Sequence, residues 1–207
     1  SLLGGLFFLV HPANVEAVAW ISQLKTNGAL ALALGALLAR RRRPWLAALL
    51  FALALLTKAT AVAALPMAAA AAWAGREGRR GWLGVGLWTA LFALYCVPEL
   101  SAHEKTGFFA VAAYENPWVQ LRTIAAIGAR YLAMAASSWG VGAFQDPPPA
   151  LDPFDPWWLA AWPAAALLAW RTAQSLRARS AEAGFWLGAA AGFAPVSQLT
   201  PFLFPIA

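Results

Sequence analysis

Long apolar runs separated by short polar segments are the feature that most restricts how this chain can fold. Hydrophobic residues make up 61% of its 207 residues and charged residues only 12%, whereas soluble domains contain about 45–50% apolar and about 25% charged residues. The mean hydropathy is +0.61. Such a chain has too little polar surface for a soluble particle of this size, so we expect an integral membrane segment.

The arginines cluster in short runs between the apolar stretches, which is the pattern of cytoplasmic loops in a membrane protein. The clusters are Arg40–Arg43, then Arg76, Arg79 and Arg80, then Arg171, Arg177 and Arg179. The net charge of +6 would also suit a nucleic-acid binder, but this placement argues against one. We predict that the three clusters are cytoplasmic and that 11–25, Lys58 and 99–118 face outside.

A lysine interrupts the apolar stretch of residues 45–75. Because arginine clusters lie at both ends of this stretch, the chain must enter the membrane and return, with Lys58 near the external side. Each arm has roughly 13–17 residues, which is short for a membrane span. We therefore predict two short helices, 45–57 and 59–75, that meet at Lys58. A lysine there either extends its amine to water at a helix end or faces an anionic headgroup or phosphate.

Two arginines fall in the later apolar stretch 119–139. After an outward crossing at 82–97 and an external loop at 99–118, full crossings at both 119–139 and 157–170 would leave the third arginine cluster outside. We therefore expect 119–139 to be re-entrant or interfacial. Arg122 and Arg130 would then bind phosphate, because guanidinium groups form bidentate contacts with it. Pairing with a carboxylate is the alternative, and the candidates are Glu99, Glu104 and Glu115.

Taken together, these segments predict an all-α fold, a polytopic transmembrane helical bundle, because lipid offers no partner for unpaired backbone groups. No solenoid repeat or low-complexity linker divides the chain, so residues 1–207 are expected to form one multi-pass membrane domain. Both termini fall inside apolar stretches, and we expect the domain to be incomplete at both ends.

Polar residues gather near the start of the chain. On a helix, Glu16, Gln23 and Asn27 share one face. We interpret His11, Glu16 and Lys25 as the rim of an external cavity, where Glu16 would accept a substrate proton if burial raised its pKa. An ordinary loop with interfacial polar residues is the alternative.

No metal site is predicted. The acidic residues of the 145–156 segment lie beside or near proline and are interpreted as turn formers: they are Asp146, Asp152 and Asp155. No His or Glu accompanies them at ligand spacing, and the single cysteine, Cys96, lies in an apolar run. No cofactor is assigned, and a requirement for a divalent metal ion stays open.

One segment, HPANVEAVAWISQLK (11–25), resembles the HPxxVExVAWISxxK block of bacterial multi-pass proteins that carry tetratricopeptide repeats after the membrane part. These proteins are similar to the animal transmembrane O-mannosyltransferases, within the GT-C class of glycosyltransferases. The Leu55–Lys58 step, the Gly-Phe-Phe of 107–109 and the later Gln-Leu-Arg and Arg-Tyr-Leu triplets also resemble that family. Asn14 differs from the His that is common there.

The resemblance implies transfer of a sugar, such as mannose, from a polyprenyl-phosphate donor to an acceptor, protein or glycan, on the external face of the bacterial inner membrane. The family's catalytic aspartate would lie upstream of residue 1, and the repeats would lie downstream. Within this chain we expect Glu16 and His11 to be catalytic; the expected substrate-binding residues are Lys25, Lys58, Arg122 and Arg130. A membrane transporter or a non-catalytic membrane scaffold is the alternative function.

Overall fold

The computed structural model describes residues 6–7, 10–11, 24–106, 116–137 and 149–194. Every regular element among these residues is a helix, which confirms the all-α fold class. The elements are α3 (Leu24–Ala39), α4 (Pro44–Thr57), the 3-10 helix η3 (Ala59–Ala63), α5 (Ala64–Ala74), α6 (Arg79–Thr106), α7 (Pro117–Ser137), α8 (Pro156–Arg177) and α9 (Glu182–Phe193).

Prolines open three of these helices: Pro44, Pro117 and Pro156 stand first in α4, α7 and α8, where the missing N–H costs nothing. Asp155 caps α8, because its Oδ1 accepts hydrogen bonds from the amides of the next two tryptophans at 2.8 and 3.0 Å. Asp152 Oδ1 accepts from the Phe154 amide at 2.8 Å. The predicted turn role of these two aspartates is confirmed, and Asp146 lies outside the described residues.

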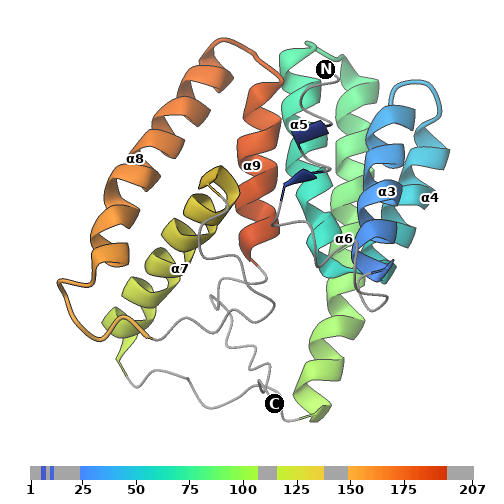
Figure 1. Cartoon of the computed structure of the whole chain (residues 1–207). Coiled ribbons are helices and arrows are strands. Elements are labelled where there is room, and N and C mark those ends of the chain that lie inside the picture. Colours follow the sequence, from blue (N-terminus) through green and yellow to red (C-terminus); the bar gives the residue numbers. More distant parts are fainter. Residues whose placement is uncertain (1–5, 8–9, 12–23, 107–115, 138–148, 195–207) are drawn as a thin grey trace.

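The helices form a row of antiparallel neighbours with a second group beside it (Figure 1). Helix α3 pairs with α4, α6 packs on α4 and α5, and α9 packs on α5 and η3. Helices α8 and α7 continue the structure beyond α9. Phe51 and Trp88 stack at the centre of the first group, with ring centroids 4.4 Å apart and planes 6° apart, and both side chains are buried.

Glycines let α9 approach α5 and η3 closely. Gly184 and Gly188 are four residues apart and so share one face of α9. A Cβ at Gly188 would lie 2.7 Å from Met67 Cγ and 3.2 Å from the Ala63 carbonyl oxygen. A side chain at Gly188 would therefore force Met67 to move. Spacing of small residues by four is typical of helices that pack tightly within membranes.

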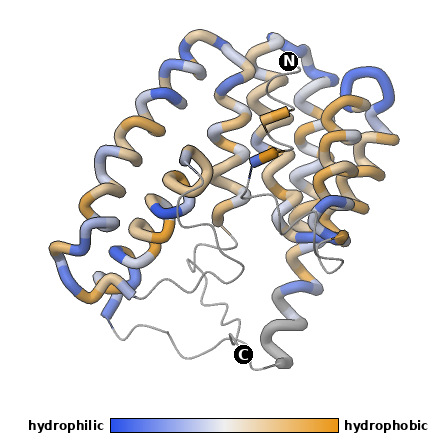
Figure 2. Tube along the Cα trace, viewed as in Figure 1, coloured by the Kyte–Doolittle hydropathy of each residue, from blue (hydrophilic) through white to orange (hydrophobic). Residues whose placement is uncertain are grey.

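The three arginine-rich turns lie at one end of the molecule (Figures 1 and 2). They are the turns between α3 and α4, between α5 and α6, and between α8 and α9. We call this the basic end. The break between α4 and η3 lies away from it, toward the opposite end, where α7 and α8 both begin. The prediction that the clusters share one side agrees with this arrangement, while the identity of that side stays a prediction.

The predicted break at Lys58 is confirmed. Helix α4 ends at Thr57, Lys58 is extended (φ −161°, ψ 131°), and the chain resumes as η3. The prediction of a loop beginning at residue 99 is wrong, because α6 runs through Pro98 to Thr106. A proline removes one backbone hydrogen bond, yet the helix continues, and Ser101 Oγ donates to the Val97 carbonyl at 2.9 Å.

Within the described residues, one segment is long and apolar enough to cross a membrane, Arg79–Glu99 in α6. Helices α3 and α4 and the η3–α5 segment are apolar but shorter. Large apolar side chains point outward on several helices; among the most exposed are Leu38, Trp45 and Leu56. Figure 2 shows the most hydrophilic colour in the turns of the basic end, with largely apolar helices below it.

Candidate functional site

The break after α4 places a lysine against the first turn of α3. Lys58 Nζ donates a hydrogen bond to Thr26 Oγ1 at 2.7 Å. Its backbone is fixed on both sides, because the Lys58 amide donates to Ala54 O at 2.9 Å and the Lys58 carbonyl accepts from the Ala61 amide at 3.0 Å. The extended residue therefore holds its amine at a defined position beside α3.

A second cation lies close to Lys58. Burial lowers the pKa of Lys58, which lies outside the Arg79–Glu99 span, and the charge of Lys25 lowers it further. Lys25 itself is exposed. Among the residues that the structure describes, no carboxylate forms an ion pair with either lysine. Two cations without a paired carboxylate create a positive potential that favours an anionic ligand.

The structure thus brings Lys25 close to Lys58, and the placement of His11 in a site shared with them stays a prediction. His11 is buried at 8% exposure, and its ring lies 5.0 Å from the ring of Phe7. The predicted role of His11 at the rim of an external cavity stays a prediction. Glu16, the other predicted catalytic residue, lies outside the described residues.

The two predicted phosphate-binding arginines project from α7. Arg122 Nε and Arg130 Nε are buried, and neither has a hydrogen-bond partner among the described residues. The Arg130 guanidinium lies over the Trp157 ring, 5.5 Å from its centroid. A buried guanidinium nitrogen without a partner is costly, and an anion bound between α7 and α8 would satisfy it. Of the carboxylates named as alternative partners, Glu115 and the side chain of Glu104 lie outside the described residues.

Helix α7 is anchored to its neighbours at the residue that follows each of these arginines. Thr123 Oγ1 accepts a hydrogen bond from the Ala150 amide at 3.0 Å, and the Tyr131 and Phe193 rings meet edge to face with centroids 5.9 Å apart. Helices α7 and α8 both begin at the same end and run side by side (Figure 1). This is the arrangement expected for a re-entrant α7; whether it crosses a membrane stays a prediction.

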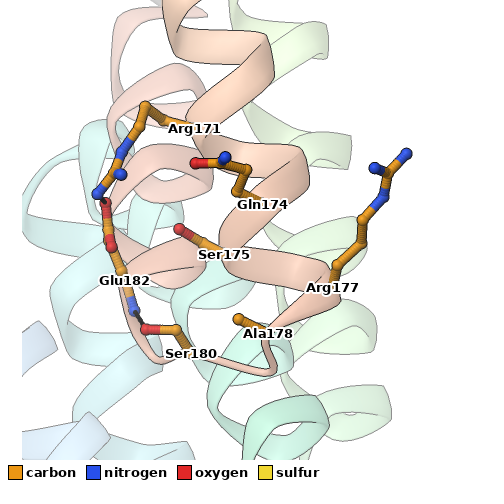
Figure 3. Close-up of a pocket in the computed structure, with 7 residues that line it drawn as sticks. All are labelled: Arg171, Gln174, Ser175, Arg177, Ala178, Ser180 and Glu182. Atoms are coloured by element: carbon orange, nitrogen blue, oxygen red, sulfur yellow. Dashed lines mark hydrogen bonds and ion pairs between the residues drawn. The ribbon is translucent and has the colours of Figure 1, made fainter.

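A cavity at the α8–α9 turn was not predicted from the sequence. It is a shallow hollow of about 700 Å³ that is open to solvent, and its lining residues include Arg171, Gln174, Arg177 and Glu182 (Figure 3). Arg171 Nη2 pairs with Glu182 Oε1 at 2.7 Å. Figure 3 shows that Arg177 points away from this pair. The sequence feature nearest to this hollow is the third arginine cluster, and we used that cluster only to predict membrane topology.

No metal centre can be built from the described residues, since none of them form a group of three or more His, Cys, Asp or Glu side chains that could hold an ion. Cys96 is half-buried and is not in a disulfide.

Comparisons of the chain with protein-family models, curated proteins and solved structures found no match.

Proposed function

We propose that this chain is the membrane part of a glycosyltransferase in which the Lys25–Lys58 pair binds the phosphate of a polyprenyl-phosphate sugar. The observation that carries the proposal is Lys58: half-buried, held by Thr26, beside Lys25 and without a paired carboxylate among the described residues. The resemblance of residues 11–25 to a block found in GT-C proteins supports the same chemistry.

Helix lengths support a water-filled recess at Lys58. At 1.5 Å per residue, the 16 residues of α3 span about 24 Å and the 14 residues of α4 about 21 Å. The hydrocarbon core of a bilayer is about 30 Å thick. With the basic end at one membrane surface, these helices stop short of the other surface. Ionisable side chains at such depth usually face water or a ligand, so the lysines would line a recess open to the external side.

The proposed reaction uses these groups in distinct ways. As the glycosidic bond breaks, negative charge grows on the departing phosphate, and Lys58 and Lys25 stabilise it. Arg122 and Arg130 offer further contacts to an anionic group, either on the donor or on a lipid. Glu16 would accept a proton from the acceptor. The acidic residue that the family places upstream would complete the site.

A transporter or a non-catalytic scaffold is the competing function. Broken helices near the middle of the membrane are also typical of transporters, and the α4–η3 break is one such feature. Transporters of that kind pair two breaks through an internal repeat. Within the described part of the chain, Lys58 is the one extended residue that separates two consecutive apolar helical segments. Because no second break pairs with it there, we favour the transferase over the transporter.

The purified full-length protein is expected to move radiolabelled sugar from a polyprenyl-phosphate donor to a peptide acceptor. The same protein in sealed vesicles should not accumulate free sugar. Transfer without accumulation supports the proposal. Accumulation without transfer would establish the transporter instead, and neither activity would favour the scaffold.

A further inference from the structure

The basic end concentrates most of the positive charge of the chain. Its three turns contain ten of the fifteen Lys and Arg residues: Arg40–Arg43, Arg76, Arg79, Arg80, Arg171, Arg177 and Arg179. Most of these side chains are exposed. The carboxylates in the same turns are Glu77 and Glu182, so this end has a large excess of positive charge.

Both carboxylates already form ion pairs with arginines of the basic end. Glu77 accepts hydrogen bonds from Arg40 at 2.6 and 2.8 Å and from Arg41 at 2.8 Å. Glu182 pairs with Arg171 at 2.7 Å. The remaining arginines form no ion pair with a described carboxylate, so their charges are available to an external anion.

Two of these arginines occupy backbone positions that favour glycine. Arg76 (φ 48°) and Arg179 (φ 52°) are left-handed, and each follows the C-cap of its helix, Gly75 in α5 and Ala178 in α8. Glycine is the usual residue at this position, because side chains there cost conformational energy. The Arg179 guanidinium lies 4.6 Å from the centroid of the Trp73 ring, and this contact offsets part of the conformational cost. The Arg76 side chain makes no ion pair or ring contact with the described residues. It is therefore available to bind an external anion.

Exposed tryptophans lie at the same level as the arginines. Each is within three residues of an arginine in the sequence: they are Trp45, Trp73, Trp82 and Trp170. Exposed aliphatic side chains follow on the same helices, among them Leu49 in α4 and Leu83 in α6. Tryptophan between charge and aliphatic surface is typical of the membrane interface, whereas an RNA-binding surface would not continue into aliphatic residues.

We infer that the basic end binds the phosphate groups of anionic phospholipids through its exposed arginines that form no ion pair, among them Arg42, Arg43, Arg76 and Arg177. The inference rests on the proposed membrane location but not on sugar transfer. The lipid would lie in the leaflet opposite the Lys58 recess.

To test this, the full chain in neutral detergent micelles is mixed with equal amounts of phosphatidylglycerol and phosphatidylcholine. Native mass spectrometry then measures how much of each lipid the protein retains. The wild type is expected to retain phosphatidylglycerol preferentially. Changing Arg42, Arg43, Arg76 and Arg177 to Gln should weaken this binding by about fivefold for each arginine removed. The matched control changes the same four residues to Lys, which keeps the charge and should keep most of the preference.

The variant Arg76→Gly distinguishes a role of Arg76 in lipid binding from a role in folding. Because glycine suits a left-handed position, this variant should melt at the same temperature as the wild type or higher, yet bind less phosphatidylglycerol. A lower melting temperature with unchanged lipid binding would show that Arg76 has a structural role and would contradict the inference.

Three other outcomes would overturn the inference. They are equal retention of the two lipids by the wild type, an unchanged preference in the Gln variant, and displacement of phosphatidylglycerol by inorganic phosphate or by an RNA oligonucleotide at similar concentration. Loss of sugar transfer with lipid preference intact would instead count against the proposed function alone.

Discussion

Replacing Lys58 with Met is expected to reduce sugar transfer at least about 100-fold, as when one preorganised donor to a developing negative charge is removed. Lys58 Nζ is held by Thr26 Oγ1 at 2.7 Å, so the charge is in place before the phosphate departs. The measurement is the transfer rate from a polyprenyl-phosphate sugar at saturating donor. Because the interaction strengthens as charge develops, the loss should appear mainly in kcat.

Met is the appropriate replacement because it keeps the length of the side chain without the charge. Burial lowers the pKa of Lys58, which means that the folded state disfavours its charged form. Lys58→Met should therefore fold at least as well as the wild type, and unchanged melting would separate chemistry from folding. Lys58→Arg, which keeps the charge, should retain part of the activity. Wild-type transfer by Lys58→Met would remove this lysine from the mechanism.

Replacing Glu77 with Gln is expected to have the largest effect on stability. Glu77 joins the α3–α4 turn to the α5–α6 turn through Arg40 and Arg41, and the side chains of Arg40 and Glu77 are only 8% and 11% exposed. Removing one partner of such a pair leaves a desolvated charge, so the free energy of unfolding should fall by about 3 kcal/mol, the low end of the range for buried pairs. Unfolding in detergent, followed by circular dichroism, measures this loss.

The same pair should make stability depend on pH. Burial alone would raise the pKa of Glu77, but hydrogen bonds and charges from Arg40 and Arg41 outweigh it and hold the pKa below the ordinary 4.5. A carboxylate with a depressed pKa stabilises the fold fully above its unfolded value and loses that contribution as the pH falls through its folded value. Glu77→Gln should remove this acid-dependent loss. An unchanged acid transition in the variant would contradict the role assigned to Glu77.

Glu182→Gln is the matched control for Glu77→Gln. Glu182 also pairs with one arginine of the basic end, but it is 37% exposed and Arg171 is 44% exposed. Exposed ion pairs contribute little, because solvent screens them. The control should therefore unfold almost as the wild type does.

The break at Lys58 could be predicted from the sequence because a charge between two apolar runs, flanked by arginine clusters, allows few arrangements. The hydrogen bond from Lys58 to Thr26 could not, since the partners are 32 residues apart and no local pattern links them. The role of Glu77 was missed for the same reason, because its arginine partners lie 36 and 37 residues away.

One sequence-based expectation failed at an identifiable place. Pro98 was treated as the end of a helix, but the residues after it continue α6 to Thr106. The loss of one backbone hydrogen bond at Pro98 therefore did not end the helix. His11 was expected to line an external cavity; it is buried with its ring 5.0 Å from the Phe7 ring, and its role stays a prediction. Its neighbours in the sequence are both polar and aromatic, and spacing alone does not decide which of them it contacts.

The most direct test of the account places one cysteine at each end of α3 in a chain whose native Cys96 is replaced by Ser. Arg42 lies in the turn after α3, and Lys25 lies in its first turn and is exposed. In intact cells, a membrane-impermeant maleimide should label Lys25→Cys, while Arg42→Cys should react only after the membrane is opened. Labelling of both positions from the same side would contradict a membrane-embedded α3 with its lysine end in an external recess.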